Sequence, residues 1–322
     1  MSKPTETSER FVIFITEPIE HSSLDILRTI GEVRLGDPGQ RYTEESLTEA
    51  LRECDAVLIT SRDRITRAVI EAAPRLKVIS KYGARPEKVD LEAAAERGIT
   101  VLCTPTSNPE SVAEHAILLI LALQRGLCDV TASLRAGQWR NRIKIGTELA
   151  GKTVGLVGMG NVGSAVARKL SGFGVTLLAY DPWVDASKAA ALRVELVDLE
   201  TLLRSSDVVS LHAMVTPESH HMIGEAQFRM MKPTSVLINT ARGPLVEETA
   251  LVTALQEHWI SGAGIDVYEE EPVPSTNPLL QMDSVIATPH ISAHTHEAME
   301  REFTWAAEDV KRVLLGEPPL HC

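Results

Sequence analysis

Short apolar runs alternate with longer amphipathic stretches along most of this 322-residue sequence. Strands buried on both faces of a parallel sheet read as apolar runs, and the chain returns between them through helices. The alternation therefore predicts an α/β protein built on doubly wound parallel sheets. In the first part of the chain it predicts strands at Phe11–Ile15, Ala56–Thr60, Lys77–Ser80 and Ile99–Leu102, and helices at Ser23–Ile30, Thr43–Glu53, Thr66–Ala73 and Asp90–Arg97.

A second series of apolar runs begins after residue 150 and predicts a second sheet. A long helix at about 110–125 leads into it, followed by residues 126–150, which have no clear period and include Arg140 and Arg142. We expect this segment to join the two sheets, and we expect a last helix at about 297–315. The strands predicted for the second sheet are Thr153–Val157, Val175–Tyr180, Val208–Leu211, Val236–Ile238, Gly262–Ile265 and Val285–Ala287.

The charge balance bears on the partners of the chain. It has 32 Lys and Arg against 44 Asp and Glu, a formal net charge of −12, which disfavours nucleic acid and anionic membranes as partners. The most apolar stretch, Ala116–Leu123, is far short of the ~20 residues that a membrane span needs, and the polar N-terminus lacks the apolar core of a signal peptide. We therefore expect no nucleic-acid or membrane partner and a cytoplasmic location.

Metal and disulfide chemistry have little support in the sequence. The four cysteines are scattered and form no CxxC pair, as a zinc site or a small disulfide framework would require. His294 and His296 form an HxH pair, but no cysteine or acidic cluster accompanies them. We expect reduced thiols and no metal site.

A glycine-rich turn with GxGxxG spacing follows the predicted strand at 153–157. Its glycines, Gly158, Gly160 and Gly163, open a predicted helix at Val162–Phe173. In a strand–turn–helix unit these glycines permit a tight turn, close approach of a pyrophosphate and close helix–strand packing. The helix N-terminus adds unpaired N–H groups for the phosphates. The turn therefore predicts a dinucleotide site.

An aspartate at the end of the next predicted strand indicates which dinucleotide binds. Asp181 stands 21 positions after Gly160, and an acid about 20 residues on accepts hydrogen bonds from the adenosine ribose hydroxyls. A carboxylate there repels a 2′-phosphate, and the next two residues, Pro182 and Trp183, supply no cation. We expect NAD rather than NADP.

Polar residues follow four strands of the second series. They are His212, the segment 239–242, Asp266 and His290. Because the carboxyl ends of parallel strands face one crevice of an open α/β sheet, these residues should converge on one site.

The order of these motifs identifies a family resemblance. The sequence resembles the D-isomer-specific 2-hydroxyacid dehydrogenase family in GLVGMGNVG, INTARGPLVEE, GAGIDVYEEEP and ATPHISAHTHEA, and in VAEHAILLILAL before them. The resemblance implies two Rossmann/flavodoxin-like doubly wound domains, with the nucleotide domain inserted into the substrate domain. It implies a substrate domain at 1–104 and 296–322, an NAD-binding Rossmann domain at 105–295 with a dimer-forming excursion at 110–150, and a homodimer.

The resemblance implies that Arg242, Glu271 and His290 are catalytic, and their chemistry agrees. A histidine, with its usual pKa near ~6.5, can give and retake the proton of an alkoxide. A carboxylate beside it favours the charged ring, and a guanidinium suits a planar carboxylate. Taken singly, Arg242 also fits a surface ion pair, His290 a buried core histidine, and Glu271 a solvated acidic loop.

The same resemblance implies a set of cofactor contacts. One of its segments departs from the family pattern, because Met214 stands where a proline is usual, although Thr216 and Pro217 are retained. The implied cofactor-binding residues are Gly158, Gly160, Asn161, Val162, Gly163, Asp181, His212, Thr216, Thr240, Ala241 and Asp266.

A loop of the first domain departs further from the family pattern. Members of the family usually have the sequence GVGxDNVD where this chain has residues 83–90. In those members the backbone N–H groups of the loop hold the substrate carboxylate. We assign that role to Gly83, Ala84 and Arg85, although Arg85 replaces a glycine and Lys88 an asparagine. With Lys81 these cations suggest a substrate carrying a second anionic group. The alternative is that Arg85 and Lys88 face solvent or pair with nearby acids.

The sequence thus predicts an NAD-dependent oxidoreductase that interconverts a (R)/D-2-hydroxy acid and its 2-oxo acid. One alternative is a non-catalytic, NAD(H)-sensing interaction protein. Others are a hydroxypyruvate or glyoxylate reductase with a small substrate, and a relative acting on phosphite or formate.

Overall fold

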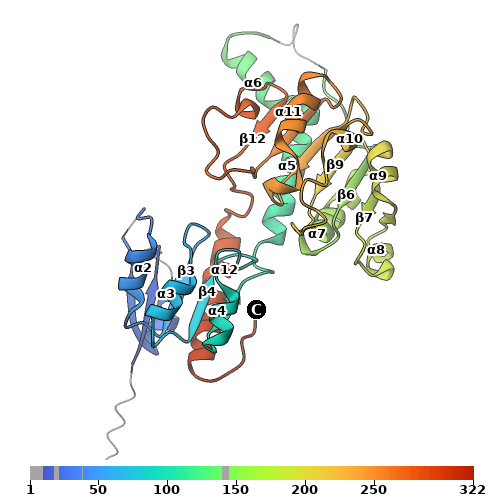
Figure 1. Cartoon of the computed structure of the whole chain (residues 1–322). Helices are drawn as coiled ribbons and strands as arrows, with labels where there is room; N and C mark the ends of the chain where they lie inside the picture. The colour runs from blue at the N-terminus through green and yellow to red at the C-terminus, as the bar shows by residue number, and fades with distance from the viewer. Residues whose placement is uncertain (1–9, 18–21, 38, 140–144) are drawn as a thin grey trace, which may run out of the picture. The chain divides into compact units, whose positions relative to one another are not determined.

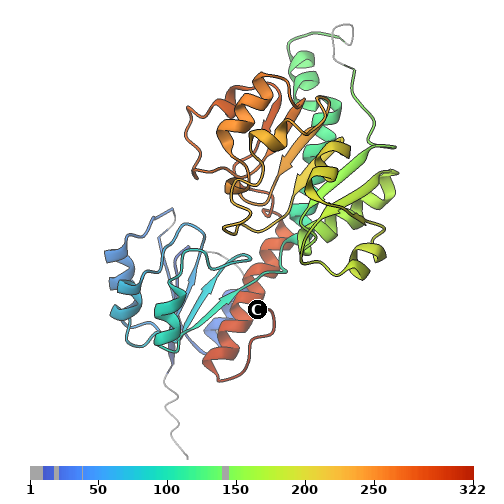
Figure 2. The ribbon, with the colours of Figure 1, turned by 45° about the vertical axis from the view of Figure 1, so that its right-hand side comes forward.

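The computed structural model describes residues 10–17, 22–37, 39–139 and 145–322. The chain forms two compact units, one made of 1–108 and 295–322 and the other of 109–294. Each unit has its own parallel sheet with helices on both faces (Figure 1, Figure 2). The predicted class, α/β with two doubly wound parallel sheets, is confirmed.

The first unit is a five-stranded sheet between two helical layers. Its strands are β1 (Phe11–Ile15), β2 (Gly31–Leu35), β3 (Ala56–Ile59), β4 (Val78–Lys81) and β5 (Thr100–Cys103), and its helices are α1 (Ser23–Arg28), α2 (Glu44–Leu51), α3 (Arg67–Ala72), α4 (Leu91–Glu96) and α12 (His296–Leu314). The strand order is β2-β1-β3-β4-β5. Side chains of α2, α3 and α4 cover one face and those of α1 and α12 cover the other.

The second unit is a seven-stranded sheet. Its strands are β6 (Thr153–Val157), β7 (Thr176–Tyr180), β8 (Glu195–Leu196), β9 (Val208–Leu211), β10 (Val236–Asn239), β11 (Gly262–Ile265) and β12 (Val285–Ala287), and its helices are α5 (Pro109–Arg125), α6 (Leu127–Arg135), α7 (Asn161–Leu170), α8 (Ala186–Ala191), α9 (Leu199–Ser205), α10 (Glu225–Phe228) and α11 (Glu248–Gln256). The order β12-β11-β10-β9-β6-β7-β8 reverses direction at β6. Ligands of open α/β sheets bind at the carboxyl ends beside such a reversal.

Two strands, β2 and β8, were not predicted from the sequence. Both lie at a sheet edge. In β2, Glu32 and Arg34 form an ion pair of 2.9 Å on the strand surface, and both residues of β8 are exposed. Because an edge strand has a neighbour on one side only and can carry charged side chains, it need not read as an apolar run.

The segment without a clear period also contains a helix. α6 follows α5 after a bend at Gly126, whose φ is +56°. Within the described ranges, no single helix is long and apolar enough to cross a membrane, and α5 and α6 meet that test only as a pair bent by 60°. Arg140 and Arg142 lie outside the described residues.

Candidate active site

The glycine turn after β6 has the geometry of a phosphate cradle. Gly158 has a φ of +100°, and a Cβ there would lie 2.7 Å from the Ala213 nitrogen. A Cβ on Gly163 would lie 2.1 Å from the Gly158 carbonyl oxygen, so α7 can pack on β6 only with glycine there. No heavy atom lies within 4 Å of the corresponding position at Gly160. The turn is therefore closed on the protein side and open at Gly160.

Backbone donors surround this opening. Asn161 and Val162 begin α7, and the first N–H groups of a helix have no partner within the helix. Gly160 is exposed at the N-cap position. These groups and the helix dipole suit an anionic phosphate.

Asp181, at the end of β7, is tied to the glycine turn. Its carboxylate accepts hydrogen bonds from the Met159 N–H (2.7 Å) and the Trp183 N–H (2.9 Å). Lys188 of α8, which the sequence analysis did not identify, donates from Nζ to the Met159 carbonyl at 3.2 Å. The turn therefore combines a fixed carboxylate with one nearby cation.

Two buried polar atoms beyond β9 and β10 lack a partner among the described residues. They are His212 Nδ1 and Thr240 Oγ1. The other ring nitrogen of His212, Nε2, lies 2.9 Å from Ser210 Oγ. Burial lowers the pKa of His212 to about 4, so the ring is neutral near pH 7. Because buried polar atoms are normally hydrogen-bonded, these two atoms favour a polar ligand at this site.

The segment after His212 forms a compact turn. Ser219 Oγ donates to the Met214 carbonyl (2.6 Å), and the Thr216 N–H donates to Ser219 Oγ (2.8 Å). The Thr216 hydroxyl in turn accepts from the Ser219 N–H (3.2 Å). These bonds hold the turn with methionine in the place of the usual proline.

His290 and Glu271 form a hydrogen-bonded pair. His290 Nδ1 lies 2.7 Å from Glu271 Oε2. Burial raises the pKa of Glu271, but the bond and charge of His290, the Tyr268 N–H and the charge of Arg242 outweigh it and hold that pKa below its usual range. A charged carboxylate only accepts, so Nδ1 of His290 carries the proton and Nε2 remains for a substrate.

Arg242 reaches the same site from β10. The Asn239 side chain accepts from the Ala241 N–H (3.1 Å) and donates to the Arg242 carbonyl (2.9 Å), which shapes the turn after the strand. The charge of Arg242 is among the causes that lower the pKa of Glu271. The structure thus brings Arg242, Glu271 and His290 together from three separate strand ends.

Asp266, after β11, supports the loop that carries His290. Its carboxylate is fully buried and accepts from the Thr288 hydroxyl (2.5 Å) and from the N–H groups of Ile291 (2.9 Å) and Ser292 (2.8 Å). His290 itself has a φ of +55°, a left-handed conformation that non-glycine residues rarely adopt. Such strain persists only where neighbours fix the backbone, as Asp266 does here.

In the first unit, the loop after β4 offers backbone donors. The Gly83 N–H donates a hydrogen bond to Thr104 Oγ1 (3.1 Å) and therefore already has a partner within the protein. The N–H groups of Ala84 and Arg85 make no hydrogen bond with any residue that the structure describes. The loop therefore leaves the N–H groups of Ala84 and Arg85 available.

The cations of this loop differ in their surroundings. Lys81 is buried, with Nζ 3.8 Å from Glu87 Oε2, whereas Lys88 is exposed. Arg85 is half-buried, and its guanidinium has no ion pair with a described residue. Burial raises the pKa of Glu302 of α12 to about 7, although the charge of Lys81 opposes this. Among these cations, Arg85 is half-buried and has no ion pair with a described residue.

Comparisons with known proteins agree with this geometry. Residues 117–292 match the model of the D-isomer specific 2-hydroxyacid dehydrogenase NAD binding domain. The D-3-phosphoglycerate dehydrogenase of Methanocaldococcus jannaschii is 41% identical over 95% of this chain, which spans only 58% of that relative. The glyoxylate reductase of Korarchaeum cryptofilum is 38% identical over 95% of this chain and 94% of its own length. A Thermus thermophilus protein of known structure superposes with a TM-score of 0.91 at 36% identity, covering 96% of this chain and 99% of its own.

Fold and site together define a dinucleotide-dependent α/β oxidoreductase. The open glycine turn and the unpartnered atoms of His212 and Thr240 fit a bound dinucleotide. The chain belongs to the D-isomer specific 2-hydroxyacid dehydrogenase family. The matched region is the NAD binding domain of that family, so its cofactor is NAD.

Proposed function

We propose that His290, Arg242 and Glu271 carry the reaction between a D-2-hydroxy acid and its 2-oxo acid. The observation that supports this most is the 2.7 Å bond from His290 Nδ1 to Glu271, within the electrostatic reach of Arg242. His290 donates a proton from Nε2 to the oxygen that becomes the hydroxyl, and takes it back in oxidation. Arg242 binds the substrate carboxylate and stabilises charge on the carbonyl oxygen. Glu271 orients the ring and favours its protonated form.

We propose that Gly158, Gly160 and Gly163, with Asn161 and Val162, hold the pyrophosphate and that Asp181 binds the adenosine ribose. NADH supplies the hydride when it is bound. The other contacts come from the ends of β9, β10 and β11, where two unpartnered atoms support this assignment. These other residues are His212, Thr216, Thr240, Ala241 and Asp266.

We propose that 105–295 is the NAD-binding domain and that 1–104 with 296–322 is the substrate domain. The division of the chain into compact units at 108/109 and 294/295 supports this assignment. Within the substrate domain, Gly83, Ala84 and Arg85 form the loop that binds the substrate carboxylate, with the free N–H groups of Ala84 and Arg85 as donors.

We further propose that Arg85 selects substrates with a second anionic group, such as a phosphate, sulfonate or second carboxylate. The test is NADH oxidation with a panel of 2-oxo acids that runs from glyoxylate, pyruvate and hydroxypyruvate to phospho-, sulfo- and dicarboxylic members. We expect the highest kcat/KM for a doubly anionic acid. In Arg85→Ala we expect kcat/KM to fall by about tenfold or more for that acid and to stay unchanged for the other acids. Lys88→Ala, which removes an exposed cation of the same loop, is the matched control.

Three results would overturn parts of this assignment. Full efficiency of Arg85→Ala on the best dianionic acid removes the selective role of Arg85. Turnover of small uncharged-tail acids only points to a glyoxylate or hydroxypyruvate reductase. NADH binding without turnover of any member favours a non-catalytic NAD(H) sensor.

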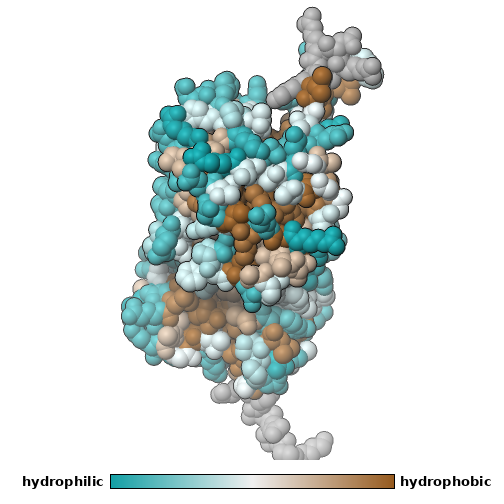
Figure 3. All heavy atoms as spheres, turned by 90° about the vertical axis from the view of Figure 1, so that its right-hand side faces the viewer, coloured by the Kyte–Doolittle hydropathy of each residue, from teal (hydrophilic) through white to brown (hydrophobic). Residues whose placement is uncertain are grey.

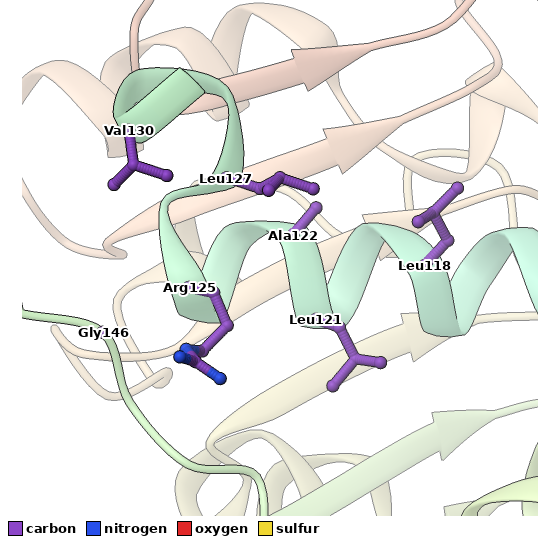
Figure 4. Close-up of a pocket in the computed structure, with 7 residues that line it drawn as sticks. All are labelled: Leu118, Leu121, Ala122, Arg125, Leu127, Val130 and Gly146. Atoms are coloured by element: carbon purple, nitrogen blue, oxygen red, sulfur yellow. The ribbon is translucent and has the colours of Figure 1, made fainter. Parts of the chain in front are cut away.

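We propose that a second copy of the chain covers the apolar surface of α5 and α6. Leu118, Leu121, Ala122, Leu127 and Val130 line a pocket of about 480 Å³ there (Figure 4). Leu118 and Leu127 are about half exposed, at 53% and 49%. Figure 3 shows a small group of hydrophobic side chains at the surface, at the upper right of its view. Burying such area is the main driving force of association.

Sedimentation velocity tests this proposal. We expect a homodimer, and we expect Leu118→Glu with Leu127→Glu to give monomers that still bind NADH. Leu91→Glu, which changes an equally exposed leucine of the first unit (52%), serves as the control. A monomeric wild-type protein contradicts the proposal.

We also propose a cytoplasmic location. All four cysteines are free thiols, which is the usual state in a reducing compartment. Cell fractionation with antibody detection tests this assignment, and recovery of the protein outside the cytoplasmic fraction contradicts it.

A further inference from the structure

A second histidine contacts the support of the catalytic loop. His115 lies on α5, and its side chain is 13% exposed. Its Nε2 lies 3.1 Å from the Thr288 hydroxyl oxygen and 3.8 Å from Asp266 Oδ1. His115 stands in the VAEHAILLILAL segment of the sequence, but no site role was predicted for it. Its contacts nevertheless join α5 to the segment that carries His290.

The hydrogen-bond directions follow from the donors present. The Thr288 hydroxyl donates its one proton to Asp266 Oδ1 at 2.5 Å. Towards His115 the same oxygen therefore accepts, and Nε2 of His115 carries the proton. The chain of bonds runs from His115 through Thr288 to the buried carboxylate of Asp266.

This carboxylate fixes the backbone on either side of His290. It accepts from the N–H groups of Ile291 and Ser292, and the Asp266 carbonyl accepts from the His290 N–H at 2.8 Å. The Tyr268 hydroxyl donates to the Thr288 carbonyl at 3.1 Å. Because His290 has a φ of +55°, its backbone depends on these neighbours to hold that conformation.

We propose that His115 is a positioning residue that sets the orientation of the Thr288 hydroxyl and, through Asp266, the place of His290. The inference rests on the proposed role of His290. His115 touches neither substrate nor the reacting atoms in this assignment. Its loss allows the Thr288 hydroxyl to turn away from Asp266 and leaves the strained loop with one constraint fewer. A misplacement of about 1 Å can lower a rate by about 10²-fold.

The first test needs no turnover. In long-range ¹⁵N–¹H spectra of ¹⁵N-histidine-labelled apoprotein at alkaline pH, where histidines are neutral, we expect His115 to be the Nε2–H tautomer. Assignment comes from the signal that is lost in His115→Gln. An Nδ1–H tautomer reverses the donor and overturns the proposal, whatever the activity of the enzyme.

The second test compares two substitutions. His115→Leu removes the donor, whereas His115→Gln places an amide N–H near the position of Nε2. We expect kcat to fall by about tenfold or more in His115→Leu and to return to within about threefold of wild type in His115→Gln, with the dissociation constant and binding stoichiometry of NADH unchanged in both. Full stoichiometry excludes a misfolded fraction as the cause of a low rate.

Glu114→Gln is the matched control. Glu114 precedes His115 on α5, but its carboxylate pairs with Lys169 at 2.7 Å and has no bond to the catalytic loop. Equal losses in His115→Leu and His115→Gln, or in the Glu114 control, overturn a positioning role. If wild type binds NADH but turns over no 2-oxo acid, the proposed function fails, and the tautomer result still decides the hydrogen-bond direction.

Discussion

The loops after β9 and β12 each present a histidine at the same edge of one parallel sheet, yet the two rings have opposite surroundings. His212 is partly exposed, but its Nδ1 is buried without a partner among the described residues, Nε2 lies beside the Ser210 hydroxyl, and desolvation lowers its pKa to about 4. The side chain of His290 is 43% exposed and bonded to the charged carboxylate of Glu271. The first ring is kept neutral by desolvation, whereas the second is partly exposed and oriented by a carboxylate.

The difference shows that position along a strand does not fix the role of a histidine. Both residues follow strands of four residues or fewer, and this position alone predicted only that they would meet at one site; their different roles were implied by the family resemblance. The partner atom decides the chemistry: a hydroxyl in an apolar surround favours neutral imidazole, whereas a carboxylate favours imidazolium. A neutral ring suits cofactor binding, and a charged ring suits proton transfer.

Substitution of the two histidines should separate rate from affinity. We expect His290→Gln to lower kcat by about 10³-fold, since it removes the acid–base group, while the dissociation constant of NADH stays near that of wild type. We expect His212→Leu to raise that constant by about tenfold, the equivalent of one hydrogen bond, with kcat changed much less. Steady-state kinetics and NADH fluorescence titration measure both. A loss of kcat in His212→Leu as large as that in His290→Gln breaks the distinction.

Removal of the carboxylate should make the loop after β12 more like the loop after β9. In Glu271→Gln the carboxylate that accepts from His290 Nδ1 is replaced by a neutral amide, which holds the ring less firmly. We therefore expect kcat for reduction to fall by about tenfold to 10²-fold, with the dissociation constant of NADH unchanged. Steady-state kinetics and NADH titration of the variant and wild type measure both values. A kcat equal to that of wild type would mean that the carboxylate does not position the ring.

Sequence reasoning predicted the central strands correctly because buried strands leave a local signature in the sequence. Thr153–Val157 and Val208–Leu211 are buried on both faces and have the predicted bounds. Asp90 caps α4 through the Ala93 N–H at 2.9 Å, as Asp and Asn side chains do at helix starts. The edge strands β2 and β8 left no such signature because their exposed faces carry charged residues.

Contacts between distant segments could not be read from the sequence. His115 lies 173 positions before Thr288, and Lys188 reaches the Met159 carbonyl from another helix. Lys81 ends β4, and Arg85 and Lys88 follow in the next loop, but only the folded structure shows that Glu87 pairs with Lys81 while the Arg85 guanidinium has no ion pair with a described residue. Such pairings depend on tertiary packing rather than on spacing along the chain.

The smallest expected effect concerns the stability that the neutral ring of His212 contributes. The folded-state pKa of about 4 lies below the usual 6.5, so the unfolded chain binds this proton more readily between those values. The unfolding free energy should therefore decline as pH falls from about 6.5 towards 4, by about 1 kcal/mol per pH unit for this group.

Urea unfolding of wild type and His212→Leu at pH 7.5, 6.5 and 5.5 isolates the contribution of His212 to the unfolding free energy, because all other titrating groups are common to both proteins. We expect the stability difference between them to shift by about 1 kcal/mol in favour of the variant from pH 7.5 to 5.5. Parallel curves would show that the ring takes up its proton in the folded state as readily as in the unfolded one, and the contrast with His290 would then lose its electrostatic basis.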